Sequence, residues 1–138
     1  MQEYIGHKND IFCSAVERGS VKIVEKMVDM KDVDVNTCES FPIKCGCQLG
    51  YIEIVKILLG SDRVVIDLKI LDFCLCAAIN NGDNGLFKVL LDDNSLVDMI
   101  GEAENWAWYK NYLKTWKKEG MIELFKKAYE RYKSRKME

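Results

Sequence analysis

The cysteines are the residues of this chain whose spacing first suggests chemistry. Four of the six form two close pairs, Cys45-x-Cys47 and Cys74-x-Cys76, which raises the possibility of a metal site. Zinc sites usually space paired cysteines two to four residues apart, on a turn. Both pairs fall in segments expected to be helical, where residues two apart point roughly 200° away from each other. We therefore expect the cysteines to pack as small hydrophobic side chains between helices. Cysteines from different helices could still meet in a metal site or a disulfide, which is the lesser alternative.

Other catalytic groups are sparse in this sequence. His7 is the only histidine, and no oriented carboxylate or oxyanion-hole motif accompanies it. The glycines of residues 82–85 (GDNG) match no phosphate-binding loop. Asp92 and Asp93 follow an expected helix end, which is typical of loop solvation. We expect a protein that is not an enzyme and that holds no metal and no cofactor.

All three tryptophans lie close together, in the segment 105–116 (NWAWYKNYLKTW), with two tyrosines among them. Trp108, Tyr112 and Trp116 are four residues apart and would share one face of a helix, whereas Trp106 and Tyr109 lie on another. One neighbouring helix cannot bury both faces. Packing against the preceding repeat is the first expectation, and an exposed partner-binding anchor, a role in which Trp and Tyr are enriched, is the alternative.

Lysines at four positions interleave with these rings: Lys110, Lys114, Lys117 and Lys118. Stacking rings combined with positive charge resemble a platform for single-stranded nucleic acid. Residues 1–109 carry 10 Lys and Arg against 18 Asp and Glu, and residues 110–138 carry 10 against 4. The acidic remainder would repel a polyanion, so nucleic acid is only the alternative partner.

Composition limits the class of protein. The chain has 138 residues, of which 49% are hydrophobic and 30% charged, with a formal net charge of −2. These values predict one soluble globular domain with a buried core. The most apolar stretch, residues 70–79, is about half as long as a membrane-spanning helix, and the N-terminus resembles no secretory signal. We expect a cytoplasmic protein with no membrane partner.

Four glycines mark an internal repeat. Gly19, Gly50, Gly82 and Gly120 are separated by 31, 32 and 38 residues. Apolar residues recur four, five, eight and nine positions after each glycine, which is one stripe of an α-helix. Small residues precede the first three glycines by four positions, so each unit is predicted to be a helical hairpin whose glycine ends the first helix in the left-handed conformation. Such units must stack on one another to bury their stripes.

In these repeats the chain resembles a divergent ankyrin-repeat protein. FPIKCGCQLG (41–50) carries the family's proline as Pro42, and VDVN (33–36) resembles its loop, as VVIDL (64–68) and LVDM (96–99) do more weakly. The run at 57–78 resembles the subtype abundant in large DNA viruses and amoebae. The resemblance implies an all-α solenoid in one domain, 1–138. Its four stacked helix-turn-helix units are 8–36, 39–68, 71–99 and 104–133, the last a modified C-terminal cap, with 134–138 as a basic tail.

Two departures from the family pattern are visible. The histidine that ties neighbouring loops together is replaced by Cys13, Lys44, Cys76 and Lys114, so we expect order between repeats to depend more on apolar packing. The fourth unit follows an insertion of about six residues and has Trp116 where the small alanine stands, which suits a repeat on which nothing further stacks.

The resemblance implies a non-enzymatic module that binds one protein partner through a concave face, with a viral adaptor or inhibitor of a host protein as its most specific form. The alternative is a nucleic-acid-binding protein that uses the basic, Trp-rich last unit. We expect a monomer rather than a homo-oligomer. The predicted partner-binding residues are those before each glycine, at the loop tips and in the aromatic segment: Glu17, Arg18, Ser40, Gln48, Leu49, Tyr51, Asp72, Asn80, Asn81, Trp106, Trp108, Lys110, Lys118 and Glu119.

Overall fold

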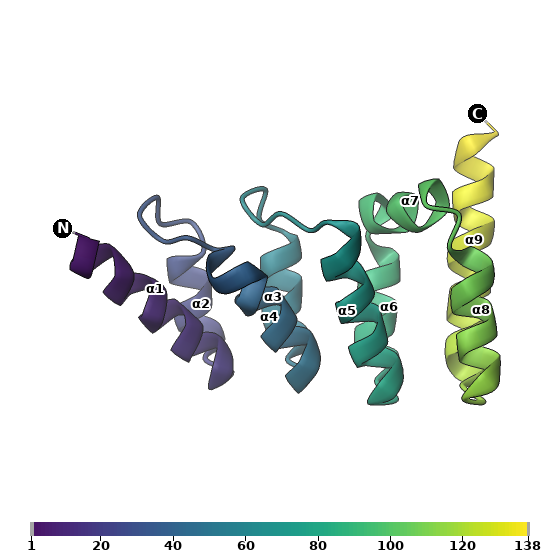
Figure 1. Ribbon diagram of the computed structural model, residues 1–138, viewed down its shortest axis with the longest axis horizontal. Helices are drawn as coiled ribbons and strands as arrows, with labels where there is room; N and C mark the ends of the chain where they lie inside the picture. The colour runs from purple at the N-terminus through teal and green to yellow at the C-terminus, as the bar shows by residue number, and fades with distance from the viewer. Residues whose placement is uncertain (1, 138) are drawn as a thin grey trace. The chain divides into compact units, whose positions relative to one another are not determined.

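A computed structural model describes residues 2–137, with side chains described from His7 onward. Within that range the chain forms helices and no strand (Figure 1), which confirms the all-α prediction. None of these helices is long and apolar enough to cross a membrane. The helices are α1 (Gln2–Glu17), α2 (Val21–Met27), α3 (Thr37–Leu49), α4 (Ile52–Leu59), α5 (Leu68–Asn80), α6 (Asn84–Asp92), α7 (Asn94–Glu102), α8 (Trp106–Thr115) and α9 (Glu119–Lys136).

The chain divides into two compact units, residues 1–74 and 75–138, and the boundary lies inside α5. In the first unit α1 packs against α2 and α3, and α4 packs against α2 and α3. The α3–α4 hairpin is close because Gly46 has no side chain: a Cβ at that position would stand 3.2 Å from Cγ2 of Val55. The small residue before the turn therefore lets the second helix approach, as its position predicts.

The first three glycines end their helices as predicted. Gly19, Gly50 and Gly82 have φ values of +69°, +72° and +65°, which cost glycine little because it lacks a Cβ. After each glycine, a backbone N–H bonds back to the small residue of the helix: Ser20 to Ala15 at 2.8 Å, Tyr51 to Gly46 at 2.9 Å and Asp83 to Ala78 at 2.9 Å. This is the hydrogen bond of a Schellman turn.

The prediction for Gly120 is wrong. Gly120 lies within the first turn of α9, and the left-handed turn residue is Lys117, with φ of +55°. The N–H of Lys118 bonds to the carbonyl of Leu113 at 2.9 Å, which is the same hydrogen bond as in the other three turns. The small-residue position of the fourth hairpin therefore belongs to the buried Leu113 and not to Trp116. The periodicity misleads because the true turn contains no glycine.

The second unit is built around α9, which packs against α6, α7 and α8. Residues 96–99, expected in a loop, belong to α7, whose N-terminus is capped by the Asp93 carboxylate accepting from the N–H groups of Ser95 and Leu96. The predicted basic tail is also helical as far as Lys136, and Arg135 pairs with Asp98 of α7 at 2.8 Å. Positive charge at the C-terminal end of α9 suits the helix dipole.

Two loops of the first unit are tied together by polar side chains. The Arg63 guanidinium donates to the carbonyls of Val28 and Met30, each at 2.7 Å, and to that of Val33. In return, the Asn36 amide donates to the carbonyl of Arg63 and accepts from the N–H of Val65, both at 2.9 Å. These bonds join the loops that follow α2 and α4. Polar contacts therefore also hold these neighbouring loops together, in addition to the apolar packing expected from the sequence.

Candidate partner-binding surface on α8

Three aromatic side chains form a ladder along α8, and we refer to Trp108, Tyr112 and Trp116 as the aromatic ladder. The rings of Trp108 and Tyr112 are stacked, with centroids 5.3 Å apart and planes 13° apart. Tyr112 and Trp116 follow with centroids 6.3 Å apart and a tilt of 59°. One helical turn separates each pair in sequence, which is why the rings meet.

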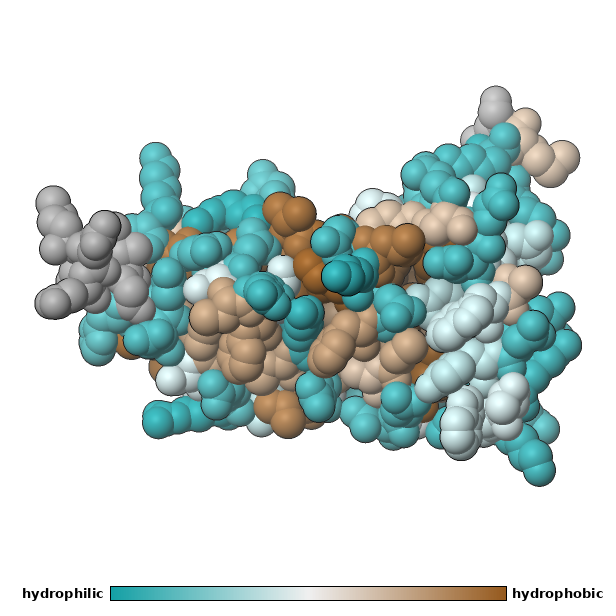
Figure 2. Space-filling model, in the orientation of Figure 1, coloured by the Kyte–Doolittle hydropathy of each residue, from teal (hydrophilic) through white to brown (hydrophobic). Residues whose placement is uncertain are grey.

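The outer rings of the ladder are open to solvent, and its middle ring is anchored. Trp108 is 52% exposed and Trp116 60% exposed. Tyr112 is half-buried, and its hydroxyl donates to Oδ1 of Asn80 at 2.7 Å. The opposite side of the helix is held by the buried side chains of Tyr109 and Leu113. In Figure 2, the surface over α8 carries a pale area, the colour of side chains that are intermediate in hydropathy.

The lysines of α8 do not share the face of the ladder. An α-helix turns about 100° per residue, so Lys110 and Lys114 project about 200° away from Trp108 and Tyr112 respectively. Both lysines are exposed. The alternation of rings and lysines in sequence therefore separates into two faces in space, whereas a nucleic-acid platform combines stacking and charge on one face.

Trp106 lies on a different face of α8 from the ladder. Its ring packs against Phe125 at 4.8 Å, Tyr129 at 5.0 Å and Tyr132 at 5.7 Å between centroids. Trp106 and Lys110, both predicted to bind a partner, line one small pocket between α8 and α9, described below as the α8–α9 pocket. The predicted aromatic site is thus two sites.

Of the predicted residues before the turns, Asn80 and Asn81 are exposed at the end of α5, and Asn80 contacts the ladder through Tyr112. In the first unit, Leu49 is exposed at the end of α3. The other predicted residues of this unit that lie near a turn are at the end of α1, at the end of α3 and just before α4. The exposed members of that set are Glu17, Arg18 and Gln48.

Tyr51, predicted to bind a partner, is half-buried and has a structural role. Its hydroxyl donates to the carbonyl of Glu17 at 3.1 Å. Its ring covers Gly19, where an added Cβ would stand 3.2 Å from the ring. Tyr51 therefore joins the turn of the first hairpin to that of the second.

The three predicted loop-tip residues are not at loop tips. Ser40 is buried and left-handed, with φ of +65°, at the kinked start of α3. Asp72 and Lys110 are exposed residues inside α5 and α8. Each residue lies within a helix because α3, α5 and α8 begin before the position predicted for the loop tip. Lys118 and Glu119 lie at the start of α9, where Lys118 is half-buried and Glu119 exposed.

Five of the six cysteines are buried or partly buried. Cys47 and Cys74 are buried, and only Cys38 is exposed. Burial, followed by negative charge on neighbouring groups, raises the pKa of the Cys13 thiol to about 11, and burial likewise raises the pKa of Cys45. A raised pKa keeps a thiol protonated and weakly nucleophilic. Among the residues with described side chains, no three metal-binding groups come together.

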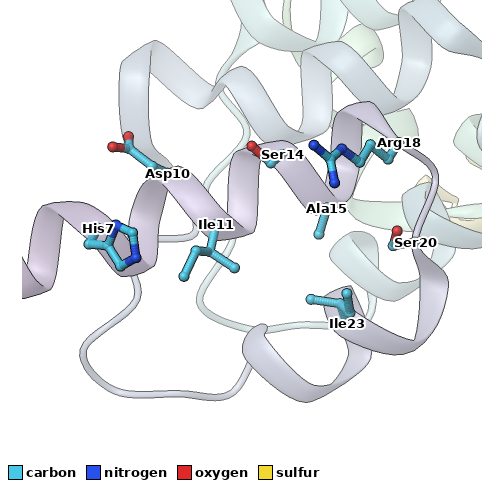
Figure 3. Close-up of a pocket in the computed structure, with 8 residues that line it drawn as sticks. All are labelled: His7, Asp10, Ile11, Ser14, Ala15, Arg18, Ser20 and Ile23. Carbon is cyan, nitrogen blue, oxygen red and sulfur yellow. The ribbon is translucent and has the colours of Figure 1, made fainter.

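His7 lies on a shallow pocket of about 440 Å³ on one side of α1 and α2 (Figure 3). Asp10 and Ser14 of α1 line the same pocket. His7 and Ser14 are seven residues apart, which is about 10 Å along a helix. Direct proton transfer needs the two groups within about 3 Å of each other, so the pocket does not assemble a nucleophile and its base.

The partner-binding residues predicted from the sequence do not include Tyr112 and Trp116. Their spacing, at intervals of four residues after Trp108, is the signal that could have identified them. Comparisons with protein-family models, curated proteins and solved structures find no match to this chain.

Proposed function

We propose that this protein is a non-enzymatic interaction module that binds one protein partner through the aromatic ladder of α8. The single observation that carries the proposal is the exposure of Trp108 and Trp116 on either side of an anchored Tyr112. Asn80, which accepts the hydrogen bond of Tyr112, provides an amide group at one edge of this surface. The rings of the ladder form an apolar centre and the asparagine amide forms part of a polar border, which is the usual organisation of a protein interface.

The energetics favour such a role. Trp and Tyr are enriched among residues that dominate binding energy, and each ring buries about 150–250 Å² when fully covered. Covering the exposed half of each tryptophan would contribute roughly 2–3 kcal/mol at about 25 cal/mol per Å². The stack on Trp108 and the hydrogen bond to Asn80 already fix Tyr112, so little side-chain entropy is lost on binding.

We further propose that the fold is a divergent ankyrin-repeat solenoid of four hairpins. Support comes from the hydrogen bond repeated at Ser20, Tyr51, Asp83 and Lys118, and from the packing of α1 on α3 and α2 on α4 within the first unit. In such a solenoid the residues before the turns border a concave face, where Leu49 and Gln48 would be further partner contacts. The resemblance to a viral subtype extends the proposal to a cytoplasmic adaptor that sequesters a host protein.

The proposal is tested by comparing what three forms of the protein bind. The wild type, a Trp108→Ala/Trp116→Ala variant and a Lys114→Ala control are used to capture proteins from cell extract. Lys114 is an exposed residue of the same helix on another face, so its replacement tests for effects unrelated to the ladder. A partner that binds the wild type and the control but not the tryptophan variant supports the proposal. Equal recovery by all three forms contradicts it.

A salt titration separates the proposal from nucleic-acid binding. Affinity for nucleic acid falls steeply with salt because phosphate neutralisation releases counterions. Binding through uncharged rings depends far less on ionic strength. Retention of an oligonucleotide that is lost in moderate salt and in variants lacking the lysines of α8 and α9 would favour nucleic acid instead.

A further inference from the structure

A second candidate site lies between α8 and α9, away from the aromatic ladder. We propose that the α8–α9 pocket holds one bulky apolar side chain of an acidic peptide segment. The pocket is lined by Trp106, Ala107, Lys110, Phe125, Lys126 and Tyr129. The proposal goes beyond the function assigned to the ladder, and either can fail without the other.

The size of the pocket sets the size of its occupant. Its volume is about 220 Å³, which is below the roughly 300–1,000 Å³ of typical small-molecule sites. A cavity of this size fits one large side chain better than a cofactor. Peptide anchors are commonly single aromatic or aliphatic side chains set into such a pocket.

The walls of the pocket are aromatic and already in place. The Trp106 ring is tilted against Phe125 and Tyr129 at centroid distances of 4.8 and 5.0 Å. Tyr129 also contacts Lys133, whose ammonium lies 4.5 Å from its ring centroid. The buried Nε1 of Trp106 has no acceptor among the described residues.

The charge around the pocket selects an acidic segment. Lys110 of α8 and Lys126 of α9 line it from its two helices, and both side chains are exposed. Glu123 lies 3.8 Å from Lys126, but both groups are more than half exposed, and such surface pairs are weak. Carboxylates on either side of the anchor would therefore meet two ammonium groups, whereas a basic segment would meet repulsion.

The test uses the full chain and short fluorescent peptides with a central phenylalanine. One peptide has Asp and Glu on both sides of the phenylalanine, a second has Lys at those positions, and a third replaces the phenylalanine of the acidic peptide by serine. Fluorescence polarisation measures each affinity, and NMR follows the indole N–H of Trp106. The acidic phenylalanine peptide is expected to bind about tenfold more tightly than either of the others and to shift the Trp106 signal.

Matched charge variants make the test specific. Lys110→Glu/Lys126→Glu should weaken the acidic peptide about tenfold and shift the preference toward the lysine peptide. Lys114→Glu/Lys127→Glu changes net charge equally at exposed residues of the same two helices that do not line the pocket, and it should leave the preference unchanged. Trp108→Ala/Trp116→Ala should also leave it unchanged, which separates this site from the ladder.

Three outcomes would overturn the proposal. The first is equal binding of the acidic and lysine peptides by the wild type. The second is an equal loss of affinity in the two charge variants, which would mean a diffuse electrostatic effect. The third is a homodimer, detected by light scattering, that Lys110→Glu/Lys126→Glu dissociates, because the pocket would then hold a second copy of this chain. Circular dichroism of each variant verifies that it remains helical.

Discussion

Trp108 and Tyr112 stack with their ring centroids 5.3 Å apart, and the hydroxyl of Tyr112 is bonded to Asn80 at 2.7 Å. The stack connects an exposed ring of α8 to the end of α5 through a half-buried one. A tryptophan that would otherwise sample several rotamers is thereby held in one position. This relationship makes the ladder a preformed surface.

Loss of the Tyr112 hydroxyl should loosen the ladder without removing a ring. In Tyr112→Phe the stack on Trp108 is kept, but the hydrogen bond to Asn80 is lost, which should cost about 1 kcal/mol of unfolding free energy. In Tyr112→Ala the stack is lost as well, and partner affinity should fall further than in Tyr112→Phe. Urea denaturation and titration with the captured partner measure the two effects. Equal affinity of both variants would mean that ring stacking has no part in binding.

Arg63 should be a main source of stability in the first unit. Its guanidinium donates to three backbone carbonyls, of Val28, Met30 and Val33. Arg63→Ala leaves these acceptors without their donor and should lower the free energy of unfolding by about 2–4 kcal/mol. Arg63→Lys should recover only part of the loss, because an ammonium lacks the planar fork that reaches separate carbonyls. Full recovery in Arg63→Lys, measured by urea denaturation, would show that charge alone matters.

Glycine should stabilise the fourth turn at Lys117, whereas loss of glycine should destabilise the other turns. Lys117 is left-handed with φ of +55°, a conformation that costs a residue with a Cβ roughly 1 kcal/mol relative to glycine. Lys117→Gly should therefore raise the thermal midpoint, whereas Gly50→Ala, at φ of +72°, should lower it. Calorimetry of the two variants tests the assignment of the fourth turn. A fall of the midpoint in Lys117→Gly would restore Gly120 as the turn candidate.

Gly101 marks a close contact between α7 and α9. A Cβ there would lie 2.1 Å from the Tyr132 ring, so Gly101→Ala forces the ring or the helix to move and should cost about 1–3 kcal/mol. In a Tyr132→Ala background the same substitution should cost much less, and a double-mutant cycle in urea measures the coupling. Absence of coupling would show that the two helices are not this close in solution.

Stability should fall at alkaline pH because of Cys13. Its pKa is raised from an ordinary 9.0 to about 11 in the folded protein, by burial first and then by neighbouring negative groups. Below about pH 9 both states keep the proton. Between pH 9 and about 11 the unfolded chain loses it and the folded chain does not, so unfolding becomes progressively more favourable. Cys13→Ala should reduce this slope in urea denaturation between these pH values, and an unchanged slope would assign it to other groups.

Three of the four turns could be predicted from sequence because glycine has a physical reason to stand at a left-handed turn. Gly19, Gly50 and Gly82 confirm that reasoning. The turn at Lys117 could not be predicted, because a lysine in this conformation leaves no signal in the sequence, whereas the nearby Gly120 resembles the other turn glycines. α7 was missed for a related reason, since residues 96–99 were assigned to a loop by resemblance while their apolar spacing fits a helix.

The candidate site was predictable in pattern but not in detail. Four-residue spacing indicated that Trp108, Tyr112 and Trp116 share a face. Which face is covered depends on where α9 places Phe125 and Tyr132, and such long-range packing cannot be inferred from local spacing. The contacts of Tyr51 and Arg63 with earlier loops were invisible for the same reason.

The most direct test of the interaction proposal is the affinity of a purified captured partner for the wild type, for Trp108→Ala/Trp116→Ala and for Lys114→Ala, measured by calorimetry at two salt concentrations. Loss of about 2 kcal/mol, typical of a dominant interface residue, is roughly a thirtyfold change. The tryptophan variant is predicted to bind at least thirtyfold more weakly at both concentrations, with the lysine control unchanged. Undiminished affinity of the tryptophan variant, with its helical fold intact, would contradict the proposal that the ladder binds the partner.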